Sequence, residues 1–362
     1  MKRNLPLRLP IMAMVFLALL AAIWAGLIRL GWAFPLLNPT LPASHGPLMI
    51  SALGTLIGLE RAVALSTRWT YGAPLLSGIG AIGLVFGVPA SPLFIFLGSL
   101  GLVFVSIFIV YRQQALYTVT MGLGALAWLA GNLLWLSGSP VASIVPWWIG
   151  FLVLIIAGER LELSRVSRPT SLSRHLFIIV TAAIVAGMLI SLVAQIAGVR
   201  IMSAGLLALA LWLGLFDIAR YTVRKSGVTR FIAVTLLLGY VWLAISGLFG
   251  LRFAGTTAGP YYDAWLHAFF LGFVLSMIFA HALIILPAVI GLSVPYHRIM
   301  YGPVFLLQAG LLLRVAGDLV LGLTARQWGG LLNAIAILWF FLQMVLLAVR
   351  QHATAEQTLA PE

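Results

Sequence analysis

The sequence contains no cysteine among its 362 residues. This absence excludes disulfides, thiolate zinc sites, iron–sulfur clusters and redox thiols. A metal or cofactor would have to be held by histidine, methionine, tyrosine or carboxylate side chains. Acidic residues are also few, because eight of them stand beside 21 lysines and arginines. Chemistry that depends on carboxylates is therefore confined to a handful of positions.

Charge of either sign is scarce. Charged residues make up 8% of the chain and apolar residues 62%, and the mean hydropathy is +1.12. Soluble proteins carry about 25% charged residues, so these values exclude a soluble globular protein. The formal net charge of +13 is interpreted as a membrane topology signal that favours anionic lipid headgroups. No nucleic-acid partner is predicted, and the lipid bilayer is the expected environment.

Long apolar runs fill most of the chain. A helix needs about 20 apolar residues to span a bilayer. Twelve such stretches are present, at 11–34, 46–66, 72–89, 92–111, 116–137, 141–158, 175–194, 200–222, 229–251, 264–290, 300–321 and 327–349. They predict an all-α integral membrane protein, a bundle of about 12 transmembrane helices. Residues 1–350 are expected to form a single polytopic membrane domain, and residues 351–362 a disordered cytoplasmic tail.

Positive charges alternate between the connections. One set of connections and both ends hold sixteen of the lysines and arginines, and the other set holds three. Arg29 and Arg314 lie inside apolar stretches. Because positive charge is retained on the cytoplasmic side during insertion, both termini are predicted to be cytoplasmic and even-numbered helices to run inward. The expected location is the cytoplasmic (inner) membrane of a bacterium, with multiple passes.

Two short motifs suggest internal repetition. The second stretch ends in GLER at residues 58–61, and the sixth ends in GER at residues 158–160. The two motifs lie about four helices apart. They hint at a four-helix unit used three times, although short matches arise easily in a chain with 36 glycines.

Two histidines are predicted to lie at one depth. His45 precedes the second apolar stretch and His267 lies near the outer end of the tenth. Two imidazoles from facing helices are the axial ligands of a bis-histidine haem. Each ring needs an acceptor for its other N–H, and Ser44 and Asp263 are nearby in sequence. The alternative is that each histidine is an interfacial residue bonded to a carbonyl or to water.

His281 follows His267 by fourteen residues, about four α-helical turns on the same face. It is a further candidate metal ligand, for a second haem or copper, or a proton relay toward the cytoplasm. The alternative is a buried histidine bonded to a neighbouring helix.

Arg314 and Asp318 are four residues apart in the eleventh stretch. This spacing predicts an ion pair on one helix face. Arg314 is at the depth of His45 and His267, where a guanidinium would pair with haem propionates. A purely structural ion pair is the alternative.

Carboxylates and arginines gather at the predicted cytoplasmic ends of the second, sixth and eighth stretches. They are Glu60, Arg61, Glu159, Arg160 and Asp217. They predict an ion-pair network that clamps the inner rim of the bundle, or alternatively a proton entry point.

The arrangement resembles subunit I of the haem–copper oxidases and, more closely, the NnrS family of twelve-helix membrane proteins. The segments HGPLM at 45–49 and HAFFLGFVLSM at 267–277 carry the likeness. It implies haem b at His45 and His267 and a link to nitric oxide stress. The oxidases have a His-x-His motif in the tenth helix. In this sequence Trp265 occupies the place of the first histidine, two residues before His267. Their copper ligands in the sixth and seventh helices have no counterpart here, so copper would lack most of its ligands and oxygen reduction is not implied.

These observations predict a membrane haem-binding protein with a role in electron transfer, sensing or nitric oxide-type stress tolerance. An electron-transfer partner would dock at the outer face. One alternative is a secondary transporter of a small solute or a proton-coupled carrier that uses Arg314, Asp318 and Asp217. Pro287 breaks the tenth stretch without a matching break six helices earlier, which counts against a transporter. A third reading is an assembly or scaffold subunit with structural histidines.

Overall fold

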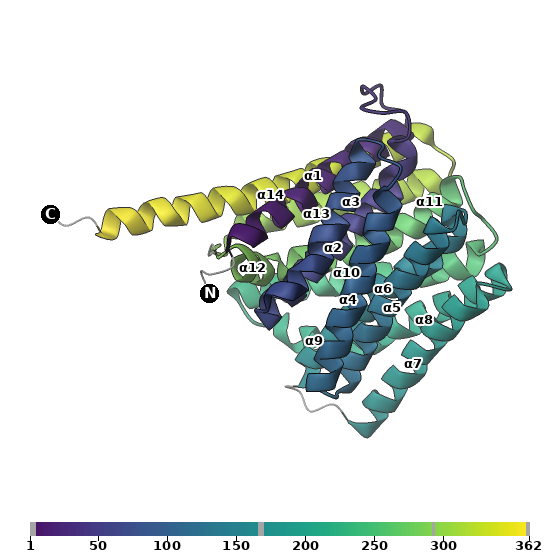
Figure 1. Ribbon diagram of the computed structural model, residues 1–362, viewed down its shortest axis with the longest axis horizontal. Helices are drawn as coiled ribbons and strands as arrows, with labels where there is room; N and C mark the ends of the chain where they lie inside the picture. The colour runs from purple at the N-terminus through teal and green to yellow at the C-terminus, as the bar shows by residue number, and fades with distance from the viewer. Residues whose placement is uncertain (1–4, 166–169, 292–293, 360–362) are drawn as a thin grey trace.

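A computed structural model describes residues 5–165, 170–291 and 294–359, and within these ranges the chain is helical, with no strand (Figure 1). The long helices and their short companions are α1 (Leu5–Arg29), α2 (His45–Leu65), α3 (Gly72–Val85), α4 (Ser91–Arg112), α5 (Leu116–Leu136), α6 (Val141–Ser164), α7 (Ser171–Ile190), α8 (Gln195–Phe216), α9 (Ala219–Thr222), α10 (Gly227–Phe253), α11 (Pro260–His267), α12 (Ser276–Ile290), α13 (Tyr301–Leu319) and α14 (Leu323–Leu359). Short 3₁₀ turns precede α2, α3 and α13 as η2 (Pro42–Ser44), η3 (Arg68–Tyr71) and η6 (Arg298–Met300).

Eleven helical spans in the described part of the chain are long and apolar enough to cross a membrane. Eleven of the twelve predicted stretches correspond to these spans. The one remaining stretch, the third in chain order, was predicted at 72–89. It forms α3, which has only 14 residues and is extended at its start by η3. The all-helical architecture expected from the sequence is therefore present in the described residues, with eleven spans that could cross a membrane and one helix shorter than a standard span.

Two spans lie at the centre of the bundle. Within their most apolar windows, 78% of the residues of Val141–Ser164 are buried and 72% of those of Pro260–Val289, against 56% or less in the other nine spans. Small residues allow close packing around them, as membrane helices require. A Cβ at Gly124 of α5 would lie 2.9 Å from the Phe151 carbonyl oxygen of α6. The central spans correspond to the sixth and tenth predicted stretches.

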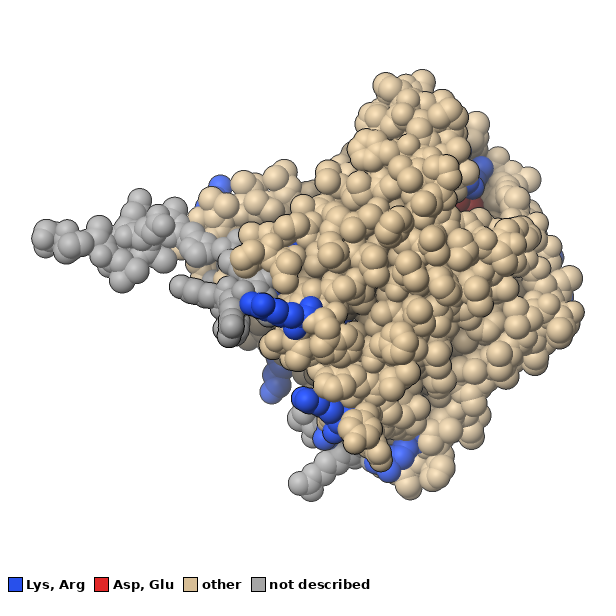
Figure 2. Space-filling view, viewed as in Figure 1, with Lys and Arg blue, Asp and Glu red and all other residues tan. Residues whose placement is uncertain are grey.

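The first and last helices place both ends of the chain on one side of the bundle (Figure 1). α14 has 37 residues and continues past the bundle on that side. It includes residues 351–359, most of the segment that the sequence predicted as a disordered tail, while residues 360–362 lie outside the described part. Lysines and arginines gather along the same side in Figure 2, and the wide face between the two sides is almost free of charge.

The tenth predicted stretch is a composite span. α11 ends at His267, the π-helical segment η5 (Ala268–Leu275) follows at once, and α12 then carries His281. A π turn holds more residues than an α turn because its hydrogen bonds run from i to i+5. The expectation that His267 and His281 share a face assumed α-helical spacing throughout, and it is wrong for this reason.

Candidate functional site

The two histidines at the outer mouth are positioned by helix starts and ends. η2 leads directly into α2, whose first residue is His45. α11 begins at Pro260 after Gly259, whose φ of 85° is readily adopted only by glycine, and it ends at His267. Proline suits the first turn of a helix because it has no N–H to leave unbonded. The local sequence thus starts both helices at fixed points and holds both imidazoles at one end of the bundle.

The rings of His45 and His267 face one another at close range. Their centroids are 6.2 Å apart and their planes differ by 23°. His45 lies against Gly26 of α1, where an added Cβ would be 2.8 Å from the imidazole carbon Cε1. Glycine at this position is required by the close approach of the ring. The matched depth expected from the sequence is therefore realised as a pair of facing imidazoles.

Each imidazole uses one nitrogen to fix its orientation. His45 Nδ1 donates to the Ala22 carbonyl oxygen at 2.7 Å. His267 Nδ1 lies 2.9 Å from the Asp263 carbonyl oxygen and 3.2 Å from Asp263 Oδ1. Of the two acceptors expected from the sequence, Asp263 has that role, whereas Ala22 replaces Ser44. Since Nδ1 carries the proton in both rings, Nε2 of each is the nitrogen with a lone pair to offer.

The spacing of this pair suits a metal held between two imidazoles. A metal–imidazole bond is about 2 Å long and the nitrogen lies about 1 Å from the ring centre, so two coaxial ligands place their centroids about 6 Å apart. The measured 6.2 Å agrees with this value. The donor set, two neutral imidazoles with their second nitrogens hydrogen-bonded, is that of a bis-histidine haem. The donor atoms and the ring spacing are therefore those that the group implied by the sequence resemblance would need.

Arg314 has a different partner from the one expected. Its Nε and Nη2 donate to the two carboxylate oxygens of Asp263, at 2.9 and 3.0 Å. Asp318 instead pairs with Arg326 at the start of α14. The predicted Arg314–Asp318 ion pair is wrong, because residues from neighbouring helices approach each charged group more closely than its own i,i+4 neighbour does.

The engagement of Arg314 changes which cation could bind a propionate. Two of its donors are taken by Asp263, which also holds His267. Arg29, at the end of α1, is exposed, and its Nη1 donates a 3.5 Å hydrogen bond to the Pro42 carbonyl oxygen. It also lies within electrostatic range of His45. Arg29 is thus the better placed anion-binding group, and Arg314 acts on His267 through Asp263.

Asp318 completes the outer cluster. Its side chain is 0% exposed, and its Oδ2 has no hydrogen-bond partner in the described structure. It lies within electrostatic range of both Asp263 and Arg314. The outer mouth therefore holds two imidazoles, two carboxylates and three arginines, drawn from α1, α2, α11, α13 and α14.

A second polar cluster lies near the other side of the membrane. Arg160 of α6 donates from Nε and Nη2 to Asp217 at 2.9 and 2.8 Å, and their side chains are 3% and 0% exposed. Its Nη1 is 3.2 Å from His281 Nε2. His281 Nδ1 in turn donates to the Met277 carbonyl oxygen at 2.8 Å. Both ring nitrogens of His281 have partners, so in this geometry it offers no lone pair to a metal.

The remaining charged residues predicted at this end lie beside the second cluster. Arg61 of α2 pairs with Glu159 of α6, and both side chains are partly exposed. Glu60 lies within electrostatic range of His281 and Glu159 but makes no ion pair within 4.0 Å in the described part of the chain. The five residues predicted at this end thus lie in the inner cluster, whereas Asp318, another candidate for the ion-pair network, lies in the outer one.

Three contributors to the outer site were missed by reasoning from the sequence. Ala22 and Gly26 belong to α1. Ala22 contributes only its backbone carbonyl and Gly26 only the space left by its missing side chain, and neither gives a signal in a single sequence. The pairing of Arg326 with Asp318 depends on how α14 packs, which a single sequence does not show. Asp263 carried a usable signal, since it precedes His267 by four residues on one helix.

Comparison with known proteins places the chain in a family but gives no function. No curated protein matches it. Among the described residues, no group of three or more histidine or acidic side chains could hold a metal ion. Any metal at this site would therefore depend on the two histidines and on ligands that the metal brings with it, such as a porphyrin. A family model matches residues 8–349, almost the whole chain. The protein belongs to the family described as Domain of unknown function (DUF8744).

Proposed function

We propose that this protein binds haem b between His45 and His267 and serves in electron transfer, sensing or nitric oxide-type stress tolerance. The observation that carries the proposal is the facing pair of imidazoles, 6.2 Å apart, each with Nδ1 bonded and Nε2 left as the donor. A haem iron with two imidazole ligands changes oxidation state without an open coordination position.

The surrounding residues have supporting roles in this proposal. Asp263 accepts a hydrogen bond from His267 Nδ1 and, with Arg314, holds the ring in one orientation. Gly26 leaves room for the His45 ring. Arg29, exposed beside His45, is the proposed partner of a haem carboxylate. An electron-transfer partner would approach the outer mouth, because this is where the pair lies.

The proposal includes an orientation in the membrane. We infer twelve crossings in the cytoplasmic membrane of a bacterium, with both termini inside and α3 with η3 as the short twelfth span. The two chain ends on one side of the bundle support an even number of crossings (Figure 1). The sixth and tenth spans are the most buried, but the second span, which a three-fold repeat of a four-helix unit would make equivalent to them, is only 50% buried in its most apolar window.

Orientation is testable with reporter fusions. Fusions after Arg350 and in the connection between α6 and α7, within the predicted loop at 159–174, are expected to report from the cytoplasm. Fusions near 38–44 and 255–261 should report from the outside, because the positive charges lie on the other side. An external reporter after Arg350 would contradict the even number of crossings.

The haem site is tested by removing its ligands. His45→Ala and His267→Ala are each expected to lose the haem or convert it from low-spin to high-spin, because one axial imidazole cannot maintain six-coordination. His175→Ala is the matched control, since His175 is exposed at the start of α7 and its ring bonds only to the Ser171 carbonyl oxygen. The measurement is the visible spectrum of each purified variant. Unchanged low-spin bands in both variants would contradict the proposal.

A second candidate function is a proton-coupled carrier. The observation that favours it is the fully buried Asp318, whose Oδ2 has no hydrogen bond, in a span with Arg314. The π-helical segment also interrupts the tenth span as carrier helices are often interrupted. Asp318→Asn would abolish proton-coupled uptake in vesicles if this function is correct, and would leave the haem spectrum in place under the first proposal.

A further inference from the structure

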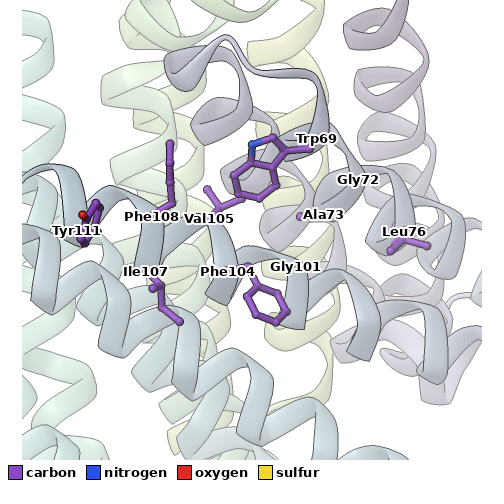
Figure 3. Close-up of a pocket in the computed structure, with 10 residues that line it drawn as sticks. All are labelled: Trp69, Gly72, Ala73, Leu76, Gly101, Phe104, Val105, Ile107, Phe108 and Tyr111. Carbon is purple, nitrogen blue, oxygen red and sulfur yellow. The ribbon is translucent and has the colours of Figure 1, made fainter.

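An apolar groove opens on the surface between two helices remote from both polar clusters. It lies between η3–α3 on one side and α4 on the other and has a volume of about 620 Å³. Figure 3 shows Trp69 standing over one side of it and Phe104, Ile107 and Phe108 along the other. Its floor is made by small residues, since a Cβ at Gly101 would lie 2.9 Å from the Ala73 Cβ.

The groove is about as long as the acyl-chain layer of one membrane leaflet is thick. From Gly101 to Tyr111, α4 rises about 15 Å at 1.5 Å per residue, which is about half of a 30 Å hydrocarbon core. The large side chains along it are open to their surroundings, with Phe104 57% and Tyr111 81% exposed. The surface is therefore apolar along a half-membrane depth and ends where α4 ends, at Arg112.

Two arginines stand at the end of the groove. Arg68 precedes Trp69 in η3, and Arg112 follows Tyr111 at the end of α4. Both are exposed, and neither has a carboxylate within 4.0 Å in the described part of the chain. The Arg112 guanidinium lies 4.5 Å from the centre of the Phe108 ring, which is itself edge-on to Trp69 at 5.7 Å. Two unneutralised cations thus stand at the mouth of an apolar slot.

We propose that this groove binds one anionic glycerophospholipid, with its acyl chains between α3 and α4 and its phosphate between Arg68 and Arg112. Charge complementarity selects the anionic headgroup, because a basic pocket between membrane helices attracts lipid phosphates. The groove lies at the start of α3, where η3 carries Trp69 beside it. The site lies apart from the proposed haem site.

Two variants remove the two halves of the proposed site. Arg68→Gln with Arg112→Gln removes the charge from two exposed positions. Gly72→Leu fills the groove, since a Cβ at Gly72 meets nothing within 4 Å and the residue has ordinary helical φ and ψ. Their matched controls are Arg200→Gln with Arg252→Gln, two exposed arginines beside another groove, and Gly214→Leu on α8, where a Cβ also meets nothing.

The test is native mass spectrometry of the delipidated full chain titrated with phosphatidylglycerol and, separately, phosphatidylcholine. The wild type and both controls are expected to retain one phosphatidylglycerol in preference to phosphatidylcholine. Loss of each arginine should weaken binding about fivefold, so the double variant should bind about 25-fold more weakly, and Gly72→Leu should lose the bound lipid. The proposal would be overturned if the wild type retained the two lipids equally, or if both groove variants bound lipid as well as the wild type does. It would also be overturned if the chain formed a dimer that Gly72→Leu alone dissociated.

Discussion

The outer and inner polar clusters use the same residue types to different ends. In both, a histidine donates from Nδ1 to a backbone carbonyl, and an arginine grips an aspartate with two hydrogen bonds. The difference lies in the second imidazole nitrogen. His281 Nε2 accepts a hydrogen bond from Arg160, whereas Arg314 donates to Asp263 and, in the described part of the chain, makes no hydrogen bond to His45 or His267.

This difference decides which cluster can hold a metal. A ring nitrogen that already accepts a hydrogen bond from a guanidinium has no lone pair left for a metal. His45 and His267 each have an Nε2 whose lone pair is not used in a hydrogen bond in the described structure, and their rings lie close together, so both could act as metal ligands. His281 is a structural member of an ion-pair network, with its tautomer fixed by Met277 and Arg160.

The largest expected effect comes from breaking the inner ion pair. Asp217→Ala should destabilise the fold by about 3–5 kcal/mol, because it leaves the buried Arg160 guanidinium without its carboxylate. Asp263→Ala should cost clearly less, because Asp318 is four residues from Arg314 and has a buried oxygen free to accept its hydrogen bond. Thermal unfolding of the purified variants in one detergent measures both.

The outcome of this pair of variants is informative in either direction. Equal losses in Asp217→Ala and Asp263→Ala would show that Asp318 does not replace Asp263. A loss below about 1 kcal/mol in Asp217→Ala would mean that Arg160 is solvated in the membrane protein, which the 3% exposure of its side chain contradicts.

A smaller effect is expected from crowding His45. Gly26→Ala adds a Cβ about 2.8 Å from the His45 ring, so the imidazole must shift by a few tenths of an ångström. The predicted result is a protein that folds but retains less haem, or haem with a mixed spin state. Gly122→Ala is the control, since the nearest atom to its Cβ would be at 3.8 Å. Haem per chain and the visible spectrum are measured; identical haem retention in both variants would contradict the close fit at His45.

The sequence predicted the helical architecture well because bilayer length imposes a strong periodic signal. Eleven apolar stretches correspond to spans, and the error at 72–89 arises because Gly87 (φ 70°), with Val88 and Pro89, ends α3 early. The predicted tail at 351–362 was misjudged because its polar composition signals exit from the membrane and says nothing about whether a helix continues. Composition fixes where hydrocarbon ends more firmly than where a helix ends.

Partners across helices could be predicted less well than depth. The charge bias placed His45 and His267 at one level, and the structure brings their rings together. The same reasoning paired Arg314 with Asp318, since sequence spacing sees only neighbours on one helix. Which carboxylate lies nearest is set by the packing of α11 and α14 against α13. The π-helical segment is similarly invisible in the sequence, yet it turns His281 away from the face of His267.

The most direct test of the central claim is the visible spectrum of the purified wild-type protein, oxidised and reduced, together with its iron and copper content. Two imidazoles facing at 6.2 Å predict a low-spin, six-coordinate b-type haem with sharp bands on reduction and one iron per chain. A folded protein that shows no Soret absorbance after haem loading, or that holds copper in place of iron, would contradict the account.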